Sequence, residues 1–145
     1  MLAGRVALDE GTDPDFGIVR YNADGSLDTT FGAAFNGIIR SDFGKGSWEE
    51  ASDVTNWLAI QSDGKIVVVG QSANTSVNPD FAVARYLPTG VLDATFGTAG
   101  KVTVDFFGAI DGATGVVVQP DRRIAVGGFA RNAGSIGFAM ARLLP

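Results

Sequence analysis

The chain has 145 residues and a formal charge of −5, from 11 basic and 16 acidic residues, and it contains no cysteine and no histidine. This composition excludes disulfides, thiolate nucleophiles, Ser-His-Asp triads and zinc sites built from the usual nitrogen and sulfur ligands. The acidic balance and the scattered cations argue against a nucleic-acid partner, and no apolar run reaches the length of a membrane span. We expect a single repeat domain over residues 1–145, large enough to bury a core of its own.

The dominant feature along the chain is an internal repeat of about 55 to 65 residues. An apolar segment that carries Phe near its start and Arg near its end occurs three times, at residues 15–21, 80–86 and 137–143. A Leu-Asp-x-Thr-Phe-Gly segment follows the first two copies, and a Gln-x-Asp turn before a β-branched run starts at both Gln61 and Gln119. The repeats divide the chain into a partial unit 1–53, a full unit 54–111 and a partial unit 112–145.

Within one unit the signals are those of strands and turns. The runs 58–61 and 65–70 flank Asp63-Gly64, and Asp-Gly between two such runs strongly predicts a hairpin. Residues 81–86 and 101–106 predict two further strands, so that one unit is a four-stranded antiparallel sheet. The whole chain is predicted to be all-β, with ten strands distributed three, four and three.

Sheets of this kind cannot bury an apolar face alone, so successive units are expected to stack, either radially as the blades of a β-propeller or linearly. In the radial arrangement the chain is β-propeller-like, with about two and a half blades. Such a partial propeller is completed either by further blades of a longer chain or by oligomerisation.

Several aromatic residues recur at repeat positions, which indicates core packing rather than ligand stacking. They are Phe16, Phe81 and Phe138, and Phe31 with Phe96. Phe16 with Ile18, Phe81 with Val83, and Phe138 with Met140 are predicted to lie on equivalent sheet faces in successive units.

A charged pair also recurs. Arg20 lies eight residues before Asp28, and Arg85 lies eight before Asp93, each pair on either side of the same turn. We expect each Arg to hydrogen-bond its Asp and so to fix the connection, although a ring of binding sites around a propeller axis is the alternative. Arg142 has no equivalent Asp in this chain and is either solvated, paired with another carboxylate, or paired across an interface.

The first unit has extra residues between Asp42 and Asp53, and these include Trp48, Glu49 and Glu50. They are interpreted either as a surface loop or as a candidate binding loop. With an aromatic platform for a sugar ring, Glu49 and Glu50 are also the best candidates for a carboxylate pair of a hydrolase acting on polysaccharide.

We expect no cofactor. Calcium is the alternative, because two acidic segments resemble parts of calcium loops. One comprises Asn22, Asp24, Ser26 and Asp28, and the other comprises Asp9, Glu10, Asp13 and Asp15. Most of these oxygen-bearing residues are missing from the second unit, which favours turn and loop roles instead.

The segments at 80–86, 90–97 and 119–128 resemble the delta-60 repeat, a bacterial repeat assigned to β-propellers. The resemblance covers nearly the whole chain and implies propeller blades of the kind found in surface or secreted proteins, although the N-terminus lacks the pattern of a signal peptide. It implies no catalytic residue and no cofactor.

The function predicted on this basis is a non-enzymatic structural or interaction module. Its expected partners are copies of itself, further blades, a protein or a glycan. A carboxylate-dependent hydrolase and a calcium-stabilised surface domain are the alternatives.

Overall fold

The computed structural model describes residues 1–6, 15–34, 36–44, 53–73 and 78–145. The described residues form ten strands and no helix, in three antiparallel sheets. The first sheet contains β1 (Leu2–Val6), β2 (Asp15–Val19) and β3 (Ile38–Ser41). The second contains β4 (Val54–Ile60), β5 (Ile66–Ser72), β6 (Asp80–Tyr86) and β7 (Lys101–Val104). The third contains β8 (Asp111–Val118), β9 (Ile124–Asn132) and β10 (Ser135–Leu143).

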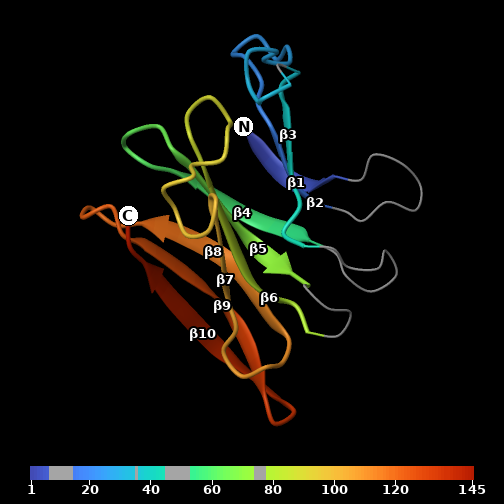
Figure 1. Ribbon diagram of the computed structural model, residues 1–145, viewed down its shortest axis with the longest axis vertical. Coiled ribbons are helices and arrows are strands. Elements are labelled where there is room, and N and C mark those ends of the chain that lie inside the picture. The colour runs from blue at the N-terminus through green and yellow to red at the C-terminus, as the bar shows by residue number, and fades with distance from the viewer. Residues whose placement is uncertain (7–14, 35, 45–52, 74–77) are drawn as a thin grey trace.

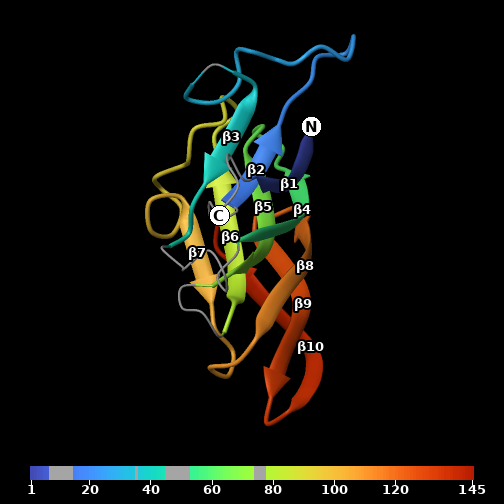
Figure 2. The ribbon, with the colours of Figure 1, turned by 90° about the vertical axis from the view of Figure 1, so that its right-hand side faces the viewer.

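The strands of each sheet follow one another in sequence order, as expected for propeller blades. The four-stranded sheet lies between the two three-stranded sheets, with the first sheet at one end and the third at the other (Figures 1 and 2). The chain is therefore all-β and has the architecture of a partial β-propeller, with strands distributed three, four and three.

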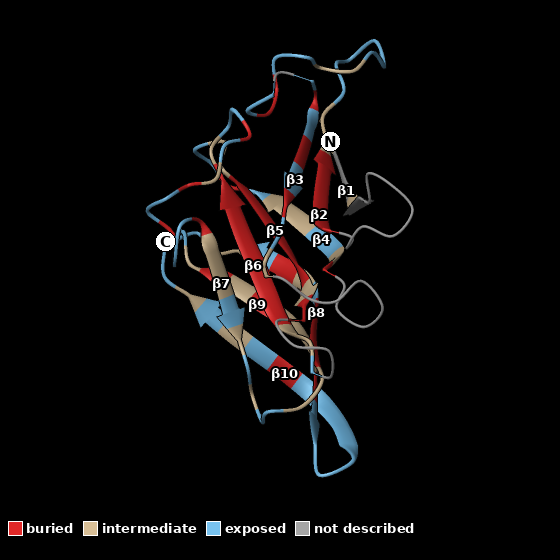
Figure 3. Ribbon diagram, turned by 45° about the vertical axis from the view of Figure 1, so that its right-hand side comes forward, coloured by how far each residue is buried: buried red, intermediate tan, exposed pale blue. Residues whose placement is uncertain are grey.

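Two apolar cores hold the sheets together. The core between the first and second sheets contains Phe16 and Ile18 from β2 with Ile66 and Val68 from β5. The core between the second and third sheets is built by the opposite faces of β5 and β6 together with β8 and β9. The second sheet is thus covered on both faces, and its strands β5 and β6 are almost entirely buried (Figure 3).

The first strand of the second sheet starts earlier than the sequence pattern predicted. β4 begins at Val54 instead of residue 58, because a bulge between Thr55 and Trp57 interrupts the alternation of side chains. β8 has a bulge at the equivalent place, between Ala113 and Gly115. At the other end of the blade, β7 stops at Val104 instead of residue 106.

A glycine in the next strand accompanies each bulge. A Cβ atom on Gly70 would lie 1.8 Å from the carbonyl oxygen of Val54, and a Cβ on Gly128 would lie 2.0 Å from that of Gly112. Only glycine lets the bulged backbone approach so closely. The two glycines are therefore structural requirements of the repeat.

The described residues contain no helix that is long and apolar enough to cross a membrane.

Candidate functional site

The charged pair of the first repeat is present. Arg20 Nε donates a hydrogen bond to Asp28 Oδ2 at 2.7 Å, and the Thr30 hydroxyl donates to Asp28 Oδ1 at 2.6 Å. The Arg20 guanidinium also lies 4.2 Å from the centre of the Phe31 ring and donates to the carbonyl oxygen of Pro88 at 2.9 Å. Arg20 thus links the turn of its own sheet to the connection that follows β6.

The second repeat reproduces this arrangement in a buried setting. Arg85 Nε donates to Asp93 Oδ2 at 2.9 Å, the Thr95 hydroxyl donates to Asp93 Oδ1 at 2.6 Å, and Lys65 Nζ lies 3.0 Å from Asp93 Oδ2. Burial alone would raise the pKa of Asp93, but the hydrogen bonds from Thr95 and Lys65 and the charge of Arg85 outweigh it and hold that pKa well below its usual range. Each pair fixes the strand-to-strand connection of its own repeat, and Arg20 in addition contacts Pro88 of the second repeat.

Arg142 holds the equivalent position in the third sheet. Its side chain is exposed, and within the described part of the chain it forms no ion pair. It belongs to the same face of β10 as Phe138 and Met140, because side chains two residues apart in a strand point to the same side.

The face of β10 that carries Phe138 is uncovered. Phe16 and Phe81 are 0% exposed, whereas Phe138 is 80% exposed and Met140 is 62% exposed. The β9–β10 pair has the same register as the β5–β6 pair. Phe81 is opposite Gln71, and Phe138 is opposite Phe129, which is the equivalent of Gln71 in the next repeat. The expectation that Phe138 belongs to the core is therefore wrong for this structure, because none of the described sheets covers that side of β10. Most of β10 is exposed (Figure 3).

A shallow apolar groove of about 490 Å³ runs along this face. Its lining includes Val117 from β8, Phe138 and Met140 from β10, and Trp57 from β4. Four large apolar side chains that are all exposed form a patch of the kind that marks interaction sites. We call this surface the β10 face.

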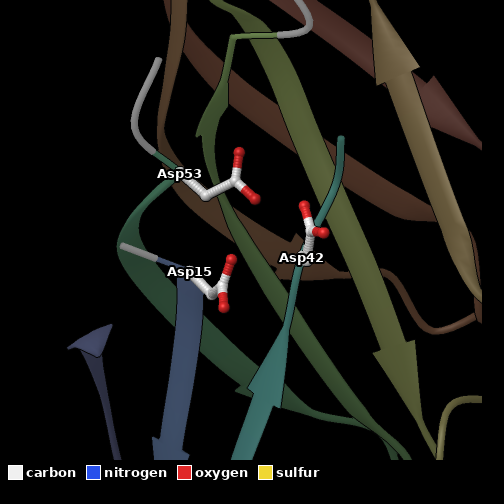
Figure 4. Close-up of side chains that lie close together, drawn as sticks. All are labelled: Asp15, Asp42 and Asp53. Atoms are coloured by element: carbon white, nitrogen blue, oxygen red, sulfur yellow. The ribbon is translucent and has the colours of Figure 1, made fainter. Parts of the chain in front are cut away.

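The structure also gathers aspartates where successive sheets meet. Asp15 at the start of β2, Asp42 after β3 and Asp53 before β4 direct their carboxylates toward one another (Figure 4). One carboxylate oxygen from each residue lies within 4.8 Å of the others. Arg40 Nε pairs with Asp15 here, and Asp53 Oδ2 accepts a hydrogen bond from the Phe43 N–H at 2.7 Å.

An equivalent cluster lies one repeat later and comprises Asp80, Asp105 and Asp111, again with one oxygen each within 4.8 Å. Asp111 Oδ2 accepts a hydrogen bond from the Phe106 N–H at 2.7 Å, as Asp53 does from Phe43. Burial, followed by the charges of Asp105 and Asp111, raises the pKa of Asp80 to about 6. Carboxylate oxygens are the ligands that hard cations such as Ca²⁺ and Mg²⁺ prefer, so the two clusters are the groups of described residues that could hold a metal.

Neither cluster was among the calcium candidates drawn from the sequence. Asp24 and Asp28 of the first candidate accept hydrogen bonds from Ser26 and Thr30 within their own turns. Of the second candidate, Asp9, Glu10 and Asp13 lie outside the described residues, and Asp15 belongs to the first aspartate cluster. The signal that identifies both clusters is the recurrence of the three aspartates themselves, at 15, 42 and 53 and again at 80, 105 and 111.

The candidate binding loop with Trp48, Glu49 and Glu50 lies outside the described residues, so the carboxylate pair predicted there has no structural description. The two Arg-Asp pairs are separate from each other, and Arg142 forms no ion pair with either of them in the part of the chain that the structure describes.

Comparison with known proteins supports the architecture. A family model with the description "Domain of unknown function (DUF5122) beta-propeller" matches residues 1–31, 61–96 and 119–145, which is more than half of the chain. The matched segments contain the Arg-Asp pairs and the strand that carries Phe138. No curated protein matches the chain. The chain belongs to the DUF5122 β-propeller family.

Proposed function

We propose that this chain is a non-enzymatic interaction module of the propeller type and that it binds through the β10 face. The single observation that carries the proposal is the 80% exposure of Phe138, at a position that is fully buried in both preceding repeats. A large apolar side chain in water forgoes about 2–3 kcal/mol of transfer free energy, which a partner surface would recover. We also propose that these blades are delta-60 repeats, because the segments at 80–86, 90–97 and 119–128 resemble that repeat.

The repeat itself indicates what would cover this face. The face of β2 with Phe16 and Ile18 packs on the second sheet, and the face of β6 with Phe81 and Val83 packs on the third. The surface that fits the β10 face is therefore the face of another sheet built from the same repeat. A second copy of this chain brings such a sheet, and a head-to-tail contact of this kind can close into a ring.

The composition of the groove favours a protein surface over a glycan. Its side chains are mainly aliphatic or aromatic, with Trp57, Val117, Phe138 and Met140 as the large contributors. A glycan needs polar groups beside an aromatic platform to satisfy its hydroxyls. Arg142 at the end of the same strand would give the interface a charged margin, where rim charges steer association more than they add affinity.

Light scattering over a range of protein concentrations tests the proposal. We expect the wild-type chain to form a discrete assembly and the double variant Phe138→Ser, Met140→Ser to stay monomeric, with both retaining the circular dichroism of a β protein. Val91→Ser removes another exposed apolar side chain, on the turn after β6, and should assemble as the wild type does. A wild-type chain that is monomeric at every concentration, or a double variant that still assembles, would show that the proposal is wrong.

A further inference from the structure

We propose that Asp80, Asp105 and Asp111 form a cation-binding site at the junction of the second and third sheets, and that calcium is the ion it takes. The inference is independent of the proposed self-association, because the three residues lie outside the β10 face.

The first argument is an unsatisfied buried oxygen. Asp111 is 0% exposed, and its Oδ2 is occupied by the Phe106 N–H. Its Oδ1 is also buried and has no hydrogen-bond partner within the described part of the chain. Buried carboxylate oxygens normally have a partner, since an unpaired buried polar atom is energetically costly. A cation held between the three carboxylates supplies that partner.

The second argument comes from the equivalent cluster in the preceding repeat. Arg40 on β3 is opposite Gly17 and pairs with Asp15, so its guanidinium brings a permanent positive charge to the first cluster. The equivalent position on β7 is Thr103, opposite Ala82, and threonine carries no charge. In the described residues no Lys or Arg pairs with Asp80, Asp105 or Asp111. The second cluster thus keeps the acids and lacks the countercharge.

Free ligand atoms and an entry path complete the site. Asp105 Oδ1 accepts hydrogen bonds from the N–H groups of Phe107 and Gly108, which leaves Oδ2 for an ion. The Asp80 carboxylate accepts no hydrogen bond within the described part of the chain, so both of its oxygens remain for an ion. Asp105 is exposed, and an ion can reach the site from solvent on its side.

The ligand set favours calcium over magnesium. Carboxylates contributed by two strand termini and one turn do not impose an octahedron, and Ca²⁺ accepts irregular shells of six to eight oxygens, including water. Mg²⁺ demands near-ideal octahedral geometry and gives up its water reluctantly.

Isothermal titration with calcium chloride, after removal of metal by a chelator, tests the site, and thermal melts give a second measurement. We expect the wild-type chain to bind one calcium ion at this cluster, and its melting temperature to rise by roughly 5–10 °C at a calcium concentration about 100 times the dissociation constant. Asp80→Asn should lose both responses. This variant keeps the size of the side chain and replaces a residue that is not fully buried, so it is expected to fold.

Two further variants make the test specific. Thr103→Arg transfers the guanidinium of the first cluster to the second, and it should remove calcium binding and raise the melting temperature of the metal-free chain. Asp42→Asn alters the first cluster, where Arg40 already neutralises charge, and should leave calcium binding unchanged. A wild-type chain without a calcium response, a response that survives Asp80→Asn, or magnesium binding as tight as calcium binding would overturn the proposal.

Discussion

Arg122 and Gly64 hold the same turn position in successive repeats, and both have a left-handed backbone, with φ of 66° and 81°. The turns are equivalent in their hydrogen bonds as well. The N–H of Gly64 donates to the carbonyl oxygen of Gln61 at 2.9 Å, and that of Arg122 donates to Gln119 at 2.8 Å. The third sheet therefore keeps the hairpin geometry with a residue for which that geometry is unfavourable.

Arg122→Gly should stabilise the protein. Glycine removes the steric penalty of a positive φ, and the gain exceeds its extra entropy in the unfolded chain by about 0.5–1 kcal/mol. Denaturant unfolding at fixed pH measures this difference. Arg123→Gly is the matched control, because Arg123 does not have a left-handed backbone and pairs with Asp121. The free energy of unfolding of this variant should fall by a similar amount. Equal losses in both variants would contradict the assignment of strain to Arg122.

Gly128→Ala should destabilise the third sheet strongly. The new methyl group would lie 2.0 Å from the carbonyl oxygen of Gly112, so the bulged strand β8 would have to move away from β9. We expect a loss of about 3 kcal/mol or more in the free energy of unfolding, or failure to fold. Gly115→Ala adds the same methyl group where no atom lies within 4 Å and should change stability by less than about 0.5 kcal/mol. Similar effects of the two substitutions would mean that the close approach is not the cause.

Because of the Arg85-Asp93 pair, the free energy of unfolding should decrease at low pH. The folded-state pKa of Asp93 is lowered from the ordinary value of 3.8, so its stabilising contribution is present above about pH 4 and is lost as the pH falls through the folded-state pKa. Denaturation curves between pH 7 and pH 2 should therefore show wild-type stability decreasing toward low pH.

Asp93→Asn tests the same pair by removing its charge. The variant leaves Arg85 and Lys65 without their carboxylate, so it should be less stable at pH 7 by about 3 kcal/mol and should lose less stability on acidification. Asp121→Asn breaks an exposed pair with Arg123 and should have little effect. A pH profile unchanged by Asp93→Asn would contradict the role of this pair.

Phe81→Ala and Phe138→Ala compare one repeat position in two environments. Phe81 is fully buried between the second and third sheets, and its truncation should cost about 3–5 kcal/mol. Phe138 is exposed on the β10 face, so its truncation should cost less than about 1 kcal/mol at protein concentrations where the chain is monomeric. Thermal melts at several dilutions distinguish the two cases. A large loss in dilute Phe138→Ala would place that ring in a core of the single chain.

The repeat pattern was enough to predict the fold class, the strand distribution and the partners in the two Arg-Asp pairs. These features depend on contacts between residues that are close in the sequence. Alternating side chains predict strands, and Asp-Gly predicts a turn. One turn brings an Arg within hydrogen-bond distance of an Asp eight residues later. The bulges in β4 and β8 were missed because a bulge breaks the alternation by which a strand is recognised.

The sequence by itself determined that the chain consists of propeller-type blades and which positions are equivalent in them. Only the tertiary structure decided what each position contacts, because contact depends on the neighbouring sheet rather than on the residue. Phe81 and Phe138 hold equivalent positions in their sheets. Phe81 is buried and Phe138 is exposed, because a neighbouring sheet covers only Phe81. Likewise, the aspartates of a cluster come from two sheets, and only the stacking of those sheets brings one carboxylate oxygen of each within 4.8 Å of the others.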